Sequence, residues 1–310
     1  MKQLFLLFLL CVFISPPTFS QRYLLEFDDE KSSELLDKAE KAYVNAQYER
    51  SVKLYGKLME KEGDSAELLF NQLTSLVHTT DTLLIKNSFD KLIHSGWVDC
   101  NFLSKNKDFL AIKYIQIFNI WNEAVKSCGQ NNKECNEKIK FPELRQQLLW
   151  LQMEDINADV SLMHHFKYGA KEAESIDVLR LERKKTYVNN FFSLLNMIEK
   201  NGWLGINEVG KDGAKAVWLI AQHGNHMVAH QIKFLQQMEE AMLADNFEKK
   251  YYAHLYDRVQ ANQRKPQRYG TLRYRDEESG EWKLYAVEDQ KKLATYRTEM
   301  GLPPLKKIIE

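Results

Sequence analysis

The chain has 310 residues, with 43 basic and 43 acidic side chains, so its formal net charge is zero. This balance argues against a general electrostatic binder of nucleic acid. Charged residues make up 28% of the sequence, whereas glycine and proline are scarce, which is typical of a helical globular protein. The length is sufficient for two modest domains.

The first residues are typical of a secretory signal peptide. Lys2 precedes an unbroken apolar run over 4–14, which is too short to span a bilayer comfortably. Two prolines end the run, and Thr18 and Ser20 are the small residues expected before a cleavage site. We expect residues 1–20 to be removed, which leaves an exported, periplasmic or extracellular protein without a membrane segment. An uncleaved anchor is the alternative.

Residues 21–126 are predicted to form a helical domain that resembles a repeat. Within 33–62, apolar residues recur at helical spacing in two segments, the second of which starts near Gln47. Small residues at Ala39 and Ser51, with tyrosines between and beyond them, resemble a tetratricopeptide repeat. In that motif, small residues let two antiparallel helices approach closely.

A second, weaker helix pair is expected over 66–78 and 82–94, and 95–112 resembles the segment that closes such arrays. The concave face of a repeat array typically holds a peptide or a protein partner. A protein partner is therefore expected for this half of the chain. A generic helical hairpin is the alternative.

Three cysteines follow the signal peptide. A helix is expected over 113–126, and Cys128 and Cys135 then flank a polar, turn-rich stretch within 127–141, which we expect to be a linker loop. Export implies an oxidising compartment, so we predict that these two cysteines pair and that Cys100 remains a buried thiol. A zinc site is not expected, because neither a CxxC pair nor a neighbouring histidine accompanies them.

The remaining residues, 142–310, are predicted to form an α-helical domain with one small β-hairpin near 268–287. Apolar periodicity indicates helices over 143–166, 176–200, 213–223, 226–244, 247–263 and 287–299. Asp212 and Asn225 are the expected N-caps of the third and fourth of these. YGTLRYR and EWKLYAV alternate apolar and polar residues around DEESG, which predicts the hairpin. The expected fold class is therefore mainly α.

Several separated motifs follow one another in this domain: GW at 202–203, VGKDGA at 209–214, WLIAQH at 218–223, DRV at 257–259, QRYGT at 267–271 and GLPPL at 301–305. In this order they resemble an uncharacterised family that is widespread in bacteria and known only as a domain of unknown function. The resemblance covers about 143–308 and implies no reaction, substrate or cofactor. A helical repeat is a common companion of this domain.

The chain departs from the pattern of that family at three places. Asn225 stands where an acidic residue follows the QH pair, and Leu272 stands where a glutamine often follows YGT. After Asp155, the chain has Ile156 and Asp159 where the family usually has a glutamine and an arginine. If those polar groups are catalytic in the family, the resemblance implies lost or altered activity in this member.

Polar residues gather at helix ends in two segments, 202–226 and 257–271, and these make the candidate site. As a catalytic set, His223 would act as general base, Asp257 would orient it, and Arg268 would stabilise an oxyanion or a phosphate. Ligand contacts are expected from Gln222, Asn225, Gln267, Tyr269, Gly270 and Thr271.

Each of these residues also has a structural interpretation. His223 would interact with the last carbonyls of its helix. Asp257 and Arg268 would form an ion pair that fixes the following loop, and Gly270 would supply an unusual backbone conformation.

No metal or cofactor is expected at this site. His226 and His230 lie one turn apart, but Gly224 and Asn225 are expected to break the helix, so the histidines need not converge. No phosphate-binding glycine loop, GxSxG motif or cysteine lies in the two segments, so neither a dinucleotide site nor an acyl-transfer nucleophile is predicted.

The sequence therefore predicts a binding or scaffold module, with a protein partner at the repeat-like half and a small anionic or polar ligand at the C-terminal half. The alternative is a hydrolase-type enzyme that uses His223 as base with Asp257 and Arg268. Both hypotheses require 222–226 and 267–271 to meet at one site.

Overall fold

The computed structural model describes Arg22, Leu25, Phe27 and residues 29–95, 97, 100–168, 175–276 and 282–305. The predicted signal peptide lies outside the described residues. Within them, the chain is mainly helical with one small two-stranded sheet, which confirms the predicted fold class.

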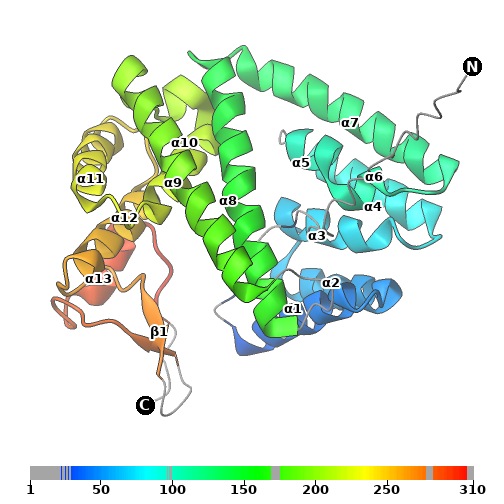
Figure 1. Ribbon diagram of the computed structural model, residues 1–310, viewed down its shortest axis with the longest axis horizontal. Coiled ribbons are helices and arrows are strands. Elements are labelled where there is room, and N and C mark those ends of the chain that lie inside the picture. Colours follow the sequence, from blue (N-terminus) through cyan, green and yellow to red (C-terminus); the bar gives the residue numbers. More distant parts are fainter. Residues whose placement is uncertain are drawn as a thin grey trace, which may run out of the picture.

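Two long helices, α8 (Pro142–Tyr168) and α9 (Ile176–Asn201), run side by side through the middle of the molecule (Figure 1). Helices α1 to α7 lie on one side of this pair, and α10 to α13 with the hairpin lie on the other (Figure 1). Helix α8 contacts elements of both sides, namely α1, α5 and α10. It is therefore the element through which the two halves are joined.

The first four helices follow the predicted pairs: α1 (Glu30–Val44), α2 (Tyr48–Glu62), α3 (Ala66–Leu76) and α4 (Thr82–His94), each packed on the next. Side-chain caps fix three of their starts, since Asp29, Ser65 and Asp81 each accept a first-turn backbone N–H. Ala39 and Ser51 are fully buried where α1 and α2 meet, and the Ser51 hydroxyl donates to the Ala39 carbonyl at 2.9 Å. The small residues thus allow the close approach that their spacing predicted.

Two short helices, α5 (Cys100–Lys105) and α6 (Lys107–Leu110), lead into the long helix α7 (Ile115–Asn136). The expected loop over 127–141 is wrong for its first ten residues, because α7 continues through them. Asn131 explains why a polar stretch stays helical: its amide donates to the carbonyls of Ile93 and Trp97 at 3.0 and 3.2 Å. Polar side chains here serve interhelical contacts rather than a turn.

The disulfide differs from the prediction. Cys100 pairs with Cys128 and so joins α5 to α7, whereas Cys135 is a free thiol. Because α7 is a continuous helix, Cys128 and Cys135 lie two turns apart and cannot approach within disulfide distance.

The C-terminal half contains α10 (Ile206–His223), α11 (Val228–Leu243), α12 (Lys249–Asn262), the strands β1 (Arg273–Arg275) and β2 (Trp282–Leu284), and α13 (Leu293–Glu299). The strands pair antiparallel, with Arg273 opposite Leu284. The hairpin prediction is confirmed, although the segment expected to be its turn lies largely outside the described residues.

Three helix starts were predicted wrongly. Helix α10 begins at Ile206, well before Asp212, and is kinked at Gly210, where φ is 76°. The Asp212 carboxylate binds Arg145 on α8, and the backbone N–H from which it accepts is that of the adjacent Gly213, so Asp212 is not the expected N-cap. Helix α11 starts after Met227 rather than after Asn225, and α13 starts at Leu293 rather than at 287.

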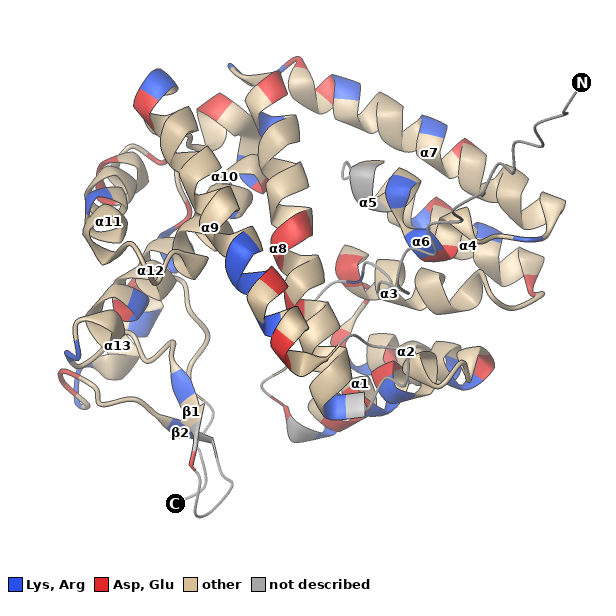
Figure 2. Cartoon of the chain, in the orientation of Figure 1, with Lys and Arg blue, Asp and Glu red and all other residues tan. Residues whose placement is uncertain are grey.

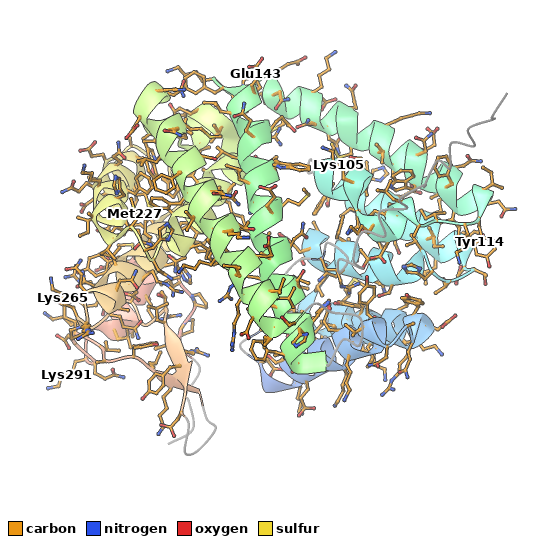
Figure 3. The ribbon with its side chains drawn as sticks, viewed as in Figure 1. Lys105, Tyr114, Glu143, Met227, Lys265 and Lys291 are labelled. Atoms are coloured by element: carbon orange, nitrogen blue, oxygen red, sulfur yellow. A yellow bond between two sulfur atoms is a disulfide. The ribbon has the colours of Figure 1, made fainter. Side chains whose placement is uncertain are left out.

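Contacts along α8 bind the halves together. Near its start, Arg145 pairs with Asp212 on α10, and near its end, His164 Nε2 lies 2.9 Å from a carboxylate oxygen of Glu40 on α1. Between them, the side chain of Lys105 reaches from α5 toward α8 (Figure 3), with its Nζ 4.0 Å from the ring centroid of Trp150. Both halves of the molecule therefore contact α8, at points from its start to its end.

Basic and acidic side chains are interspersed along the helices (Figure 2), as the balanced composition implies. Among the residues that the structure describes, no helix combines the length and the apolar character needed to cross a membrane.

Candidate functional site

His223 is the last residue of α10, and its ring lies between α8 and α9. Its Nδ1 is 2.8 Å from a carboxylate oxygen of Asp155 on α8. The ring stacks on Tyr187 of α9, with centroids 4.2 Å apart and planes inclined by 23°. Its Nε2 lies 3.8 Å from Asp159, one turn after Asp155. The histidine is thus oriented by Asp155, and the predicted orientation by Asp257 is wrong.

The carboxylate of Asp155 is fully buried, and both of its oxygens are occupied. One oxygen faces His223, and the other accepts from the amide of Asn190 at 2.6 Å. The same amide donates to the carbonyl of Leu151. Because a buried carboxylate accepts hydrogen bonds only, the neutral imidazole must carry its hydrogen on Nδ1. The lone pair of Nε2 then points away from Asp155.

Asp159 forms the more open side of this group. The side chains of His223 and Asp159 are each 18% exposed, so solvent reaches both. The hydroxyl of Tyr187 donates to Asp159, and Arg183 lies 3.4 Å from the same oxygen. Burial raises the pKa of Tyr187, and the Asp159 carboxylate raises it further, so this phenol remains a hydrogen-bond donor at physiological pH.

Gln222 points away from His223, toward α12. In the amide orientation that satisfies both of its groups, its nitrogen donates to the carbonyl of His254 and its oxygen accepts from Nε of Arg258, each at 3.3 Å. Burial lowers the pKa of Arg258, and burial also lowers the pKa of His254, to about 4, with nearby cations adding to the effect. A desolvated basic pair therefore lies on the α12 side of the α10 C-terminus.

The end of α10 is shaped by close packing. A Cβ at Gly224 would come within 2.2 Å of the ring of Phe191, so only glycine allows α9 and this turn to approach so closely. The predicted ligand residue Asn225 accepts from the amide of Asn262 at 3.1 Å. His226 and His230 pack edge-on against Phe191. In the described part of the chain, no group of three or more histidine, cysteine or acidic side chains is arranged to hold a metal ion.

The second predicted cluster, 267–271, leads into the hairpin and is held by internal hydrogen bonds; we call it the hairpin corner. Asp257, which is fully buried on α12, accepts from the backbone N–H groups of Arg268, Tyr269 and Thr271 at 2.8, 3.0 and 2.9 Å. The hydroxyl of Thr271 also donates to it at 2.9 Å. Burial raises the pKa of Asp257, while these hydrogen bonds oppose the rise. Asp257 therefore holds the chain that enters the hairpin.

Gln267 and Gly270 serve the same corner. The Gln267 amide donates to the carbonyls of Leu272 and Tyr285 and accepts from the Leu272 N–H, which joins both edges of the hairpin. Gly270 has a φ of 63°, and its carbonyl, with that of Tyr269, accepts from the Arg297 guanidinium. These residues are occupied by internal contacts.

Arg268, the predicted anion-binding residue, lies on the outer side of the corner. Its Nε donates to Glu288 at 2.9 Å, and its guanidinium lies over the ring of Tyr256. The hydrogen bond that Arg268 donates to Glu288 raises the pKa of Arg268. Its backbone, but not its side chain, contacts Asp257, so the ion pair expected between the two is also wrong.

The two predicted clusters are linked by α12, because neighbouring residues on this helix face one cluster each. Arg258 contacts Gln222 beside His223, whereas Asp257 holds the hairpin corner. The group around His223 is completed by Asp155, Asp159, Tyr187 and Asn190, none of which was predicted as a site residue. The available signal was the spacing of Asp155 and Asp159, one turn apart on a face of α8 that also carries Leu148 and Leu162, both buried.

Fold and site together define a mainly α-helical protein whose C-terminal half carries a histidine held by a buried aspartate. The chain belongs to a family of unknown function, DUF6624, whose family model matches residues 142–310. Family models do not confirm the likeness of the N-terminal half to a tetratricopeptide repeat, which stays a resemblance. No curated protein and no solved structure matches the chain.

Proposed function

We propose that the C-terminal domain carries an acid–base site, in which His223 exchanges a proton with a small polar substrate while Asp155 holds its ring. The observation that carries this proposal is that the two nitrogens of the His223 ring lie in different environments. Nδ1 is bound to a fully buried carboxylate, and Nε2 lies on the partly exposed side, 3.8 Å from Asp159. This is the arrangement that a general base requires.

A hydrolase is the simplest reaction class for such a site. The bare Nε2 takes a proton from a water molecule, and the oxygen of that water bonds to the acyl or phosphoryl centre of the substrate. The bond from that centre to the leaving group breaks, and the imidazolium returns the proton to the leaving group. Asp155 and Asp159 stabilise the imidazolium that forms, because both carboxylates lie close to the ring. Water serves as the nucleophile, so the site needs neither a serine nor a cysteine.

The test is hydrolysis of p-nitrophenyl acetate and p-nitrophenyl phosphate by the wild type and by His223→Gln. We expect turnover of at least one substrate, with a fall of about 10²- to 10⁴-fold in the variant, the usual contribution of general acid–base catalysis. His230→Gln is the matched control and should keep the wild-type rate, since His230 packs on Phe191. Equal rates in the wild type and His223→Gln contradict the proposal.

We further propose that the N-terminal half binds a protein partner. The supporting observation is a group of exposed apolar side chains where α6 leads into α7: Leu110 at 61%, Tyr114 at 51% and Ile115 at 66% exposure. Capture of partners from the native compartment should be lost in Ile115→Asp but kept in Ile232→Asp, a partly exposed position on α11. Identical captured sets from both variants contradict this second proposal.

Export is the proposed localisation. The Cys100–Cys128 disulfide supports it, because stable disulfides form mainly outside the cytosol. Fractionation of the native host should place the protein outside the cytoplasm, with a mass that corresponds to a chain beginning at Gln21. A cytoplasmic protein of full-length mass would contradict the proposal.

A further inference from the structure

Arg258 is a half-buried cation whose guanidinium has no carboxylate partner among the described residues. Within the part of the chain that the structure describes, its one polar contact is the Gln222 amide oxygen, 3.3 Å from Nε. Four other arginines in buried or half-buried positions contact a carboxylate: Arg22 with Glu40, Arg145 with Asp212, Arg183 with Asp159, and Arg268 with Glu288. The guanidinium of Arg297, also buried, donates to the backbone carbonyls of Tyr269, Gly270 and Pro303. Arg258 therefore differs from them in what it contacts.

A half-buried arginine without a carboxylate partner is suited to bind an anion. Burial lowers the pKa of Arg258, which reflects the cost of holding its charge away from water. A guanidinium presents five N–H donors in a planar fork, and Gln222 engages only Nε. The two Nη groups are the pair that binds a carboxylate or a phosphate in bidentate fashion.

The position of Arg258 relates it to the acid–base site. Gln222 and His223 are consecutive at the end of α10, and they turn toward α12 and α8, respectively. Tyr187 stacks on His223 and is near enough to Arg258 for its phenolate form to raise the pKa of the guanidinium, as is Tyr285 beside the hairpin. Tyr187 therefore lies near both the proton-accepting ring and the guanidinium.

We propose that Arg258 binds a carboxylate or phosphate group of the substrate on which His223 acts. This inference rests on the proposed acid–base function and adds to it the chemical class of the substrate. It also moves anion recognition from Arg268, whose guanidinium is paired with Glu288, to an arginine ten residues earlier in the chain.

The test measures binding of inorganic phosphate and of succinate, in separate titrations at constant ionic strength, by the full chain. We expect saturable binding of at least one of them by the wild type, and the two titrations distinguish phosphate from carboxylate recognition. Arg258→Gln should weaken that binding at least tenfold. Arg268→Gln is the matched control and should change it less than twofold.

His223→Gln separates this inference from the proposed function. It should lower hydrolysis by about 10²- to 10⁴-fold and yet bind the anion as the wild type does, because the anion contacts Arg258. If the wild type hydrolyses substrate but binds neither anion saturably, or if Arg258→Gln binds as tightly as the wild type, the inference is overturned while the acid–base function stands. Should Arg258→Gln not fold, the NMR signal of the Arg258 Nε–H decides: a saturable shift with the anion supports the inference, and an unchanged signal overturns it.

Discussion

At His223, a single hydrogen bond decides which ring nitrogen is available for chemistry. Asp155 takes the Nδ1 side at 2.8 Å, and Asn190 occupies the remaining oxygen of the same carboxylate. A buried carboxylate held in this way fixes both the tautomer and the direction of the ring. The sequence indicated the histidine but not its orienting aspartate, because the two are 68 residues apart and lie on different helices.

His254 carries a pH dependence that can be measured. Burial, with Arg297 and Arg258 nearby, lowers its pKa from 6.5 to about 4, so the unfolded chain takes up a proton at higher pH than the folded one. Stability is therefore complete above pH 6.5 and is lost as the pH falls toward 4. The loss is about 3 kcal/mol, at about 1.4 kcal/mol per pKa unit.

Urea unfolding between pH 7 and pH 4 measures this effect. In His254→Gln the decline should be smaller by about 3 kcal/mol, since the group that titrates is gone. His94→Gln, at an exposed position on α4, should decline as the wild type does. A wild-type and a His254→Gln profile of equal slope would contradict the assignment.

Among the elements, helix periodicity and the hairpin alternation were predicted correctly, and so were the ends of α4 and α9, but the ends of several other helices were not. Helix α7 was expected to stop before a polar, asparagine-rich stretch, yet Asn131 binds two carbonyls of the segment beside it and Asn136 accepts from Arg145 at 2.7 Å. The carbonyl partners of Asn131 lie 38 and 34 residues earlier in the chain. Local composition therefore could not distinguish this partly buried polar contact from a solvated loop.

The hairpin corner depends on Asp257 in the same way. Asp257→Asn replaces one accepting oxygen by an NH₂ group that faces backbone N–H donors, so at least two hydrogen bonds to a charged acceptor are lost. We expect the free energy of unfolding to fall by about 3 kcal/mol or more, since hydrogen bonds to charged groups contribute about 1.5–3 kcal/mol each.

Glu288→Gln provides the matched comparison on the outer side of the same corner. Its partner Arg268 is partly exposed, so we expect a loss of at most about 1 kcal/mol by urea unfolding. If both variants lose equally little, the corner does not depend on Asp257.

At the scale of the whole molecule, a buried group of polar side chains between α1 and α8, which we call the joint, connects the two halves. Arg22 contacts Glu40 at 3.1 Å and the hydroxyl of Tyr55 at 2.9 Å, and His164 closes the group from α8. Burial would raise the pKa of Glu40, but Arg22 and His164 outweigh it and lower the pKa to about 2. This lowered pKa implies stability that is present above pH 4.5 and is lost as the pH falls toward 2.

We expect the free energy of unfolding to fall by about 3 kcal/mol between pH 4.5 and pH 2, and urea unfolding measures this loss. Glu40→Gln should be less stable at neutral pH, because Arg22 then stays buried without its counter-charge, and should lose about 3 kcal/mol less over this interval. Glu34→Gln, whose ion pair with Lys38 is exposed, should follow the wild type. A wild-type stability that is flat from pH 4.5 to 2 would contradict the joint.

The fold class was thus predictable from local pattern, whereas the site was predictable only in part. His223 and Gln222 stand out at a helix end before a glycine. The polar residues of the QRYGT segment were equally conspicuous, but they serve an internal corner. A sequence shows where polar groups gather but not which of them contact one another, and that pairing separates the candidate site from the corner.

The most direct test of the central claim is a long-range ¹H–¹⁵N correlation spectrum of the His223 ring, recorded in the full chain at a pH where the imidazole is neutral. We expect hydrogen on Nδ1 and a bare Nε2, and Asp155→Asn should disturb this preference. A ring that carries its hydrogen on Nε2 in the wild-type protein would contradict the proposed acid–base site.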